Sequence, residues 1–283
     1  MQSLIHLDTL EAQAAHMDGL PTWTAIPNVG MRHLDPFLLI NHHGPVNFPP
    51  NNHGLPFGPH PHKGFETLTY ILEGELVHRD STGLSSNILS GGVQWMTAGK
   101  GIVHAEESSD SFKQSGGNLE IIQLWFNLPP DLKLSAPNYQ GFQRHELPEV
   151  PVQNGTFTLV AGSYLGTTGP ASSLTNMFTG ALRLNKGQAS FQVPVGHQVM
   201  FYVVRGAGRV NGVPFDTRNL LTFNLEGGEM VVSTLENCLI LIAHGAPTNA
   251  PIASYGPFVM NSPQELIEAM HEYQEGKMGS LTN

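Results

Sequence analysis

Cysteine and long apolar runs are nearly missing from this 283-residue sequence. The single cysteine, Cys238, excludes an internal disulfide framework and fits a reducing cytoplasm, which is the location we expect. No segment approaches the ~20 consecutive apolar residues that a membrane span requires, and the opening residues lack the basic and apolar regions of a secretion signal. We therefore expect no membrane partner.

Basic residues are also scarce, with 13 Lys and Arg against 23 Asp and Glu and a formal net charge of −10. A charge of this sign repels a phosphate backbone, so we expect no direct binding to nucleic acid. Only 13% of the residues are charged, whereas glycine (31) and proline (21) are abundant. This composition favours short strands and tight turns over long solvated helices, and it predicts a mostly β protein.

The length of the chain fits two domains of roughly 140 residues each. A proline-spaced segment at residues 147–151 separates two β-rich halves. We expect an N-terminal domain over residues 1–145 and a C-terminal domain over residues 146–283.

A helix is predicted for residues 263–275, near the C-terminus. Ser262 and Glu265 have the spacing of a capping box, and Pro263 occupies the first helical position. Apolar residues at helical spacing follow, and we expect this stripe to pack on a barrel of strands. The stripe comprises Leu266, Ile267, Met270 and Tyr273.

Two short motifs carry side chains that can bind a metal ion. His60 and His62 are separated by one residue, and His104 and Glu106 repeat this spacing about forty residues later. Residues at i and i+2 of a strand point to the same side about 6.6 Å apart, which allows both to reach one ion. Two such strands inside a barrel would supply three imidazoles and one carboxylate. This set suits a divalent transition metal, and an octahedral ion would keep about two positions open for water, substrate or dioxygen.

The second half of the chain shows a similar strand rhythm at residues 194–206 but contains only one histidine there, His197. We find no second pair of ligands in it. The C-terminal domain is therefore expected to be metal-free, and His197 to be a structural or surface residue.

Four longer segments surround or follow these motifs. They read HPHKGFET from residue 60, QWMTAGKGIVHAE from residue 94, QLWFNLP from residue 123 and GPFVMN from residue 256. Together they resemble the pirin family, whose members are bicupins of the cupin superfamily. The resemblance implies two face-to-face cupin β-barrels, with Fe(II) in the N-terminal barrel held by the four residues His60, His62, His104 and Glu106.

The resemblance implies one of two functions, since some pirins act as quercetin 2,3-dioxygenases and others are described as redox-dependent transcriptional co-regulators. As a dioxygenase, the protein would cleave a flavonol such as quercetin, or a related enediol, with O2 and loss of carbon monoxide. Glu106, or a water that it holds, would take the hydroxyl proton. As a regulator, it would bind a protein partner through an iron-dependent change of surface and consume no oxygen.

The residues leave the metal and several roles open. Imidazole and carboxylate ligands also accept Ni, Cu, Mn or Zn, so an isomerase-type zinc or manganese enzyme is a third hypothesis. Glu106 could stay a ligand or detach to take a proton. Gln123 could point toward the metal and contact substrate, or be a plain hydrogen-bonded amide. Glu66 is an even number of residues after His62, so on a strand it would point to the same side. Because pirins use the glutamate at the position of Glu106 instead, we assign Glu66 a structural or supporting role.

Aromatic residues and further histidines in the N-terminal half have simpler interpretations. Trp95 and Trp125 are interpreted as core anchors. A strand is expected to end near His42 and His43, followed by a loop over residues 46–61. These two histidines and His53 could bind a second, adventitious metal, but such residues are more often solvated loop histidines.

Overall fold

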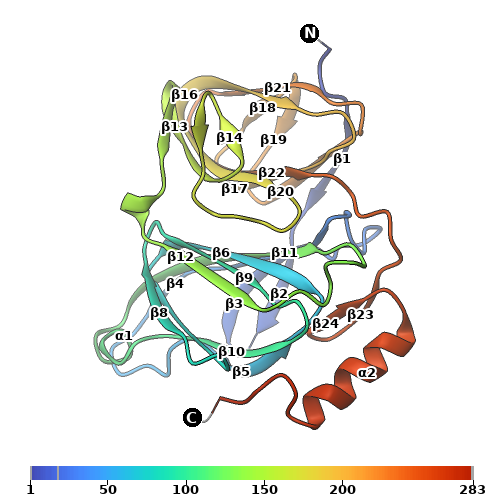
Figure 1. Ribbon diagram of the computed structural model, residues 1–283. Coiled ribbons are helices and arrows are strands. Elements are labelled where there is room, and N and C mark those ends of the chain that lie inside the picture. The colour runs from blue at the N-terminus through green and yellow to red at the C-terminus, as the bar shows by residue number, and fades with distance from the viewer. Residues whose placement is uncertain (1, 18, 282–283) are drawn as a thin grey trace. The chain divides into compact units, whose positions relative to one another are not determined.

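The computed structural model describes residues 2–17 and 19–281, which form mostly β-strands (Figure 1). Two sheets contain the strands of the first half of the chain. The seven-stranded sheet has the order β12-β9-β6-β11-β4-β3-β2, and the four-stranded sheet has the order β5-β10-β7-β8. The strands of the first sheet are β2 Gln13–Met17, β3 Leu20–Ile26, β4 Phe37–Phe48, β6 Phe65–Glu73, β9 Val93–Thr97, β11 Gly117–Asn127 and β12 Asn138–Phe142. Those of the second are β5 Phe57–His62, β7 Glu75–Asp80, β8 Ser85–Leu89 and β10 Ile102–Glu107.

A nine-stranded sheet contains most of the second half together with the first strand of the chain. Its path is β1-β20-β17-β22-β16-β21-β18-β19, with β13 paired to β16. Its strands are β1 His6–Glu11, β13 Glu149–Ala161, β16 Phe178–Val193, β17 Gln198–Arg205, β18 Gly208–Val210, β19 Val213–Phe215, β20 Asn219–Phe223, β21 Gly228–Thr234 and β22 Asn237–Gly245. The remaining elements are α1 Asp110–Ser115, the 3-10 turn Arg144–Glu146, β14 Ser163–Tyr164, β15 Thr167–Thr168, β23 Ala253–Tyr255, β24 Phe258–Met260 and α2 Pro263–Gln274.

Each half of the fold has its own apolar core. Inward-facing residues of both smaller sheets meet in one cluster, with Ile71 on β6, Leu76 on β7 and Ile121 on β11. The nine-stranded sheet closes around a second cluster that contains Leu159, Phe201 and further buried residues of most of its strands. The prediction of a mostly β fold with two barrels and a C-terminal helix is confirmed.

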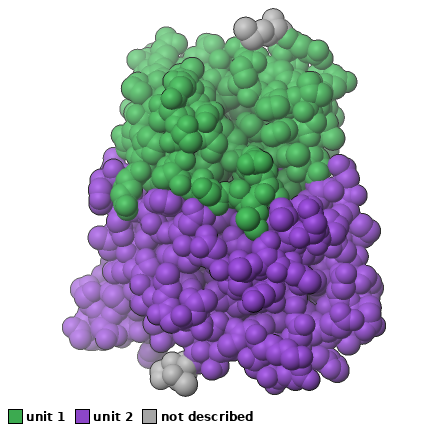
Figure 2. Space-filling view, in the orientation of Figure 1, with its two compact units in different colours: residues 1–13, 25–36, 146–247 green, residues 14–24, 37–145, 248–283 purple. Residues whose placement is uncertain are grey.

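The chain divides into two compact units, which are coloured in Figure 2. Unit 1 comprises residues 1–13, 25–36 and 146–247, and unit 2 comprises residues 14–24, 37–145 and 248–283. One boundary between the two units falls at the expected domain division after residue 145. Near the two ends of the chain the grouping differs from that division, since residues 1–13 belong to the unit of the second half and residues 248–283 to the unit of the first half. The reason lies in specific pairing: β1 pairs with β20, and α2 packs with Val103 of β10. Two separate domains at that division stay a prediction.

Helix α2 begins as predicted. The Ser262 hydroxyl accepts a hydrogen bond from the Glu265 N–H, and the Glu265 carboxylate accepts one from the Ser262 N–H. Its buried face differs in part from the predicted stripe, since Ala269 is fully buried and Ile267 is 45% exposed. Within the described residues, no helix is long and apolar enough to cross a membrane.

Strand β4 runs further than expected, through His42 and His43 to Phe48. Its pairing with β11 shifts register between Leu119 and Ile121. Gly44 lies next to this shift with φ +87°, a backbone conformation that glycine adopts without strain, and it leaves room for the Leu119 carbonyl oxygen. Both histidines are consequently buried: His42 contacts Glu120 at 2.9 Å, and His43 Nδ1 lies 2.9 Å from the Thr22 hydroxyl.

The Lys133 ammonium group is buried and ties three segments of unit 2 together. It donates to the carbonyl oxygen of Gly64 at 2.8 Å, to the Asn127 side-chain oxygen at 2.8 Å and to the carbonyl oxygen of Val259 at 3.0 Å. Replacing it leaves these acceptors buried and unpaired.

We expect Lys133→Met to lower the free energy of unfolding by about 3 kcal/mol, because each unpaired buried acceptor costs 1–3 kcal/mol. Urea unfolding measures this change, and Lys100→Met at an exposed position is the matched control. A loss for Lys133→Met no larger than that of the control would contradict the role given to this lysine.

Stability should also fall in mild acid through His43. Burial, reinforced by the neighbouring His42, lowers the pKa of His43 from 6.5 to about 4. Between these two pH values the His43 imidazole is protonated in the unfolded chain but stays neutral in the folded chain. The free energy of unfolding therefore decreases as the pH falls through this window. We expect His43→Gln to remove a slope of up to about 1.4 kcal/mol per pH unit, measured as unfolding free energies at pH 7 and pH 5. The exposed His53→Gln variant should keep the wild-type slope.

Candidate metal centre

Three histidines converge on two paired strands of unit 2. Strands β5 and β10 are antiparallel, with His104 opposite His60 and Ile102 opposite His62. The Nε2 atom of His60 lies 3.2 Å from that of His62 and 2.9 Å from that of His104. The potential ligand atoms of all three lie within 4.8 Å of one another, and His62 and His104 are almost completely buried.

The ring nitrogens that face away from the cluster indicate where the protons are. His60 Nδ1 lies 2.7 Å from the Gly58 carbonyl oxygen, and His62 Nδ1 lies 3.4 Å from that of Pro257. A carbonyl only accepts, so both Nδ1 atoms carry the proton and both Nε2 atoms carry a lone pair. Lone pairs this close repel each other unless a cation lies between them, and three imidazoles fit a divalent transition metal.

Burial favours the neutral form of two of these imidazoles, those of His62 and His104. It is the main cause that holds the pKa of His62 and of His104 well below 6.5, and the nearby histidines lower both further. Both rings are therefore neutral at neutral pH, which is the protonation state that a metal requires.

Glu106 lies outside this group of three. The register of β10 against β5 shifts between His104 and Glu106. The Glu106 carboxylate accepts hydrogen bonds from the Gln94 amide and from the Thr69 hydroxyl at 3.4 Å on one oxygen, and from the Gln123 amide at 2.7 Å on the other. Its role as fourth ligand stays a prediction, as does a substrate contact of Gln123, whose amide is directed to Glu106.

Glu66 is directed away from this carboxylate. Its carboxylate accepts a hydrogen bond from the Thr97 hydroxyl at 2.7 Å. Successive residues of a strand face opposite sides, and Thr69 of the same strand is the residue that reaches Glu106. This position supports the structural role assigned to Glu66.

Trp125 packs against the buried apolar cluster that contains Phe65, in line with its interpretation as a core anchor, and it also forms a wall beside the histidines. Its ring lies 5.1 Å from the His62 ring and 4.3 Å from that of Phe65, and it is only half-buried. Its Nε1–H donates to the Gln123 side-chain oxygen at 3.0 Å. The sequence indicated this position only through spacing: Trp125 is two residues after Gln123 on one strand, so both side chains face the same side. Trp95, in contrast, is fully buried and stacks on Phe126, as predicted.

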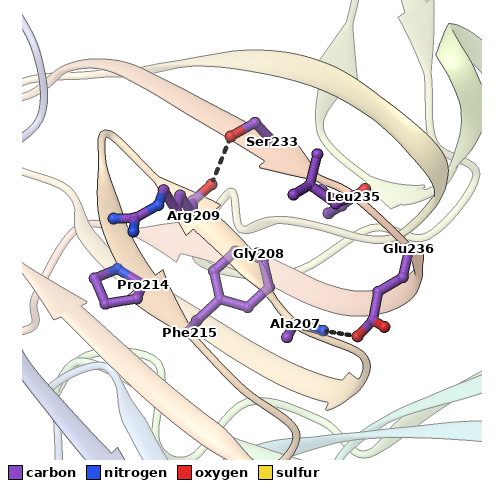
Figure 3. Close-up of a pocket in the computed structure, with 9 residues that line it drawn as sticks. Ala207, Gly208, Arg209, Pro214, Phe215, Ser233, Leu235 and Glu236 are labelled. Atoms are coloured by element: carbon purple, nitrogen blue, oxygen red, sulfur yellow. Dashed lines mark hydrogen bonds between the residues drawn. The ribbon is translucent and has the colours of Figure 1, made fainter.

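Two further features lie in unit 1. His197 Nδ1 lies 2.9 Å from His244 Nδ1, so this histidine has a partner that the sequence did not indicate. A surface pocket of about 540 Å³ is bordered by Arg209, Phe215 and Glu236, among others (Figure 3). The Glu236 carboxylate accepts a hydrogen bond from the Ala207 N–H at 2.9 Å, and the pocket has no histidine among its lining residues.

Comparisons with known proteins agree on one family. The Pirin family model matches residues 19–126, and the model of the pirin C-terminal cupin domain matches residues 181–279. A pirin-like protein of Caulobacter vibrioides is 36% identical over 251 residues, which cover 86% of this chain and 87% of that protein. This chain belongs to the pirin family.

Other pirin relatives carry enzyme names. A Pseudomonas aeruginosa protein provisionally named as a quercetin 2,3-dioxygenase is 35% identical over 92% of both chains. The crystal structure of a quercetin 2,3-dioxygenase from Acinetobacter baumannii superposes with a TM-score of 0.93 at 33% identity, covering 99% of this pirin and all of that chain. The Escherichia coli pirin YhhW, solved with nickel(II), shares the fold at 24% identity, with a TM-score of 0.66 over 83% of this chain and 96% of its own.

The short distance from Trp125 to His62 gives a direct optical test of the centre. We expect Co(II) added to the metal-free protein to quench tryptophan fluorescence, because a paramagnetic ion among the histidines lies close to this indole. Trp125→Phe should remove at least half of the quenching, because the ring centroid of Trp125 lies 5.1 Å from that of His62. His62→Ala is the control that should show no saturable quenching. Equal quenching in wild type and Trp125→Phe would contradict a metal at this position.

Proposed function

We propose that this pirin is a metal-dependent dioxygenase that cleaves a flavonol such as quercetin, or a related enediol, with O2. The observation that carries the proposal is the convergence of the three Nε2 atoms of His60, His62 and His104, with Glu106 two residues after His104 on β10. The likeness to the Acinetobacter baumannii quercetin 2,3-dioxygenase supports the same reaction class.

In this proposal His60, His62 and His104 hold the metal, and Glu106 is either the fourth ligand or the base beside it. Fe(II) is the metal we expect, although the donor set also accepts Ni, Mn, Cu or Zn. When bound, the ion supplies a Lewis acid that favours the ionised form of the substrate hydroxyl and orients the resulting anion.

Glu106 is suited to accept the substrate proton. An ionised carboxylate has about four acceptor positions, and the three donors Gln94, Gln123 and Thr69 occupy three of them. One position remains for a hydroxyl proton. The same donors hold the carboxylate still, which lowers the reorganisation that proton transfer requires.

The aromatic wall formed by Trp125 suits a flat substrate. Trp125 is half-buried with its ring next to His62, and the fully buried Phe65 ring packs against it. A planar aromatic substrate gains contact area against such a wall and excludes water from the reacting atoms. The reducing cytoplasm is the compartment we propose, because the only cysteine of the sequence, Cys238, is a buried free thiol.

Oxygen uptake tests the proposal. Protein loaded anaerobically with Fe(II) and mixed with quercetin should consume oxygen above the protein-free rate. His62→Ala should lose this activity together with the metal. If Glu106 is the base, Glu106→Gln should keep the metal and lose about 10²- to 10⁴-fold in kcat, which is the usual contribution of a general base. If it is the fourth ligand, the same variant should bind the metal more weakly. The exposed His53→Ala is the control and should match wild type.

The regulatory hypothesis uses the same ligands and makes the opposite prediction. A redox-sensing pirin would bind iron at the three histidines, consume no oxygen and change its affinity for a protein partner between Fe(II) and Fe(III). Stoichiometric iron without oxygen uptake, with Ni, Mn, Cu and Zn forms equally inactive, would contradict the dioxygenase and favour the regulator.

A further inference from the structure

A second histidine lies behind the metal-facing ring of His104. The Nδ1 atom of His104 is 3.4 Å from Nδ1 of His78, and Nε2 of His78 is 2.9 Å from an oxygen of Asp80. The other Asp80 oxygen accepts hydrogen bonds from the Thr82 N–H at 2.8 Å and from the Thr82 hydroxyl at 2.5 Å. His104, His78 and Asp80 are each at most 2% exposed.

We propose that Asp80 and His78 form a hydrogen-bonded relay that sets the tautomer and orientation of His104, and so tunes how tightly the metal is held. Both are positioning residues, since they act through His104. This inference rests on the metal site of the proposed function and is independent of its substrate.

The direction of each hydrogen bond follows from the end of the relay. An ionised Asp80 only accepts, so Nε2 of His78 donates to it. A neutral His78 then has a lone pair on Nδ1, which can only accept, so Nδ1 of His104 must donate. The remaining nitrogen of His104, Nε2, therefore carries the lone pair that faces His60 and His62. With both imidazoles neutral, one arrangement of protons satisfies every member, and it is the arrangement that a metal requires.

Strand pairing holds the relay in register. Strand β7 is antiparallel to β10, with Asp80 opposite His104 and His78 opposite Glu106. Positions 78 and 80 share one face of β7, just as positions 104 and 106 share one face of β10. The relay is thus built on regular strands, where backbone hydrogen bonds fix each Cα and limit the movement of each side chain.

Tyr139 fixes the plane of the His78 ring. The two rings stack with centroids 4.3 Å apart and an angle of 26° between their planes. The Tyr139 hydroxyl lies 3.3 Å from the Gln94 side-chain oxygen, and the amide of Gln94 donates to Glu106. Burial above all raises the pKa of Tyr139 to about 12, so this hydroxyl remains a donor. Tyr139 thereby links the relay behind His104 to the network around Glu106.

The effect of the relay follows from the charge at its end. A carboxylate behind an imidazole increases the electron density on the metal-binding nitrogen and reduces the freedom of the ring. Losing such a partner typically weakens metal binding 10- to 100-fold. We expect a change of this size when either His78 or Asp80 is replaced.

Metal affinity of two variants is the first test, with Co(II) as the probe. His78→Phe keeps the stack on Tyr139 and removes both hydrogen bonds. Asp80→Asn has one acceptor oxygen and cannot serve both His78 and Thr82. Competition with a chromophoric chelator should give a dissociation constant 10- to 100-fold above wild type for both, and the visible Co(II) absorption bands should shift. Asp110→Asn is the charge-matched control, because this carboxylate is exposed on α1 and should leave affinity unchanged.

The protonation pattern of the wild-type protein is the second test and needs no variant. Long-range ¹H–¹⁵N NMR of the metal-free and Zn(II)-loaded protein should show His78 with its proton on Nε2 and an unprotonated Nδ1. A merely structural role for His78 does not require this tautomer. This measurement keeps the inference testable if His78→Phe does not fold.

Three outcomes would overturn the relay. They are an affinity within twofold of wild type in both folded variants, a His78 proton on Nδ1, or a wild-type protein that does not bind Co(II). The last outcome would also remove the metal from the proposed function. Tight Co(II) binding that weakens in both variants, combined with no oxygen uptake by the Fe(II) form, would support the relay and contradict the dioxygenase alone.

Discussion

The antiparallel pairing of β5 with β10 is the constraint on which the metal centre depends. It puts His104 opposite His60, and the two-residue period of β5 brings His62 to the same side. A slip of one residue would turn these side chains to the other face, so the register of the ladder determines whether a site exists. Strand β10 is held on both edges, by β5 and by β7, which makes such a slip costly.

The same ladder explains how much of the site could be predicted from the sequence. Within β5, the common side of His60 and His62 depends only on the alternation of side chains along a strand, which is visible in their spacing. The pairing that brings His104 opposite His60 is a tertiary contact. The position of Glu106 depends on a register shift against another strand and on the donors Gln94 and Gln123. No spacing along one strand contains that information, so the hydrogen-bond partners of Glu106 could not be predicted, and its role as a ligand stays a prediction.

A similar contrast applies to the fold. The start of α2 was predictable because its capping box is formed by residues three apart, whereas its buried face depends on what packs against it and includes Ala269 in place of Ile267. The length of β4 was underestimated because turn-forming residues at Gly44 and Pro45 suggested an end. Pairing with β11 continues the strand past them. Local signals therefore predicted where elements begin, and tertiary pairing decided how far they extend.

The membership of residues 248–283 in unit 2 has a consequence for the order of synthesis. The histidine strands are made early, yet several groups that stabilise their surroundings come from the last part of the chain. The Pro257 carbonyl oxygen lies at His62, the Val259 carbonyl oxygen accepts from Lys133, and Glu272 pairs with Lys63. Residues 37–145 of unit 2 are synthesised before residues 146–247 of unit 1, but the segment 248–283 that provides these contacts follows both. Unit 2 therefore gathers all of its residues later than unit 1, and the contacts of the segment 248–283 around the three histidines form only after unit 1 has been synthesised.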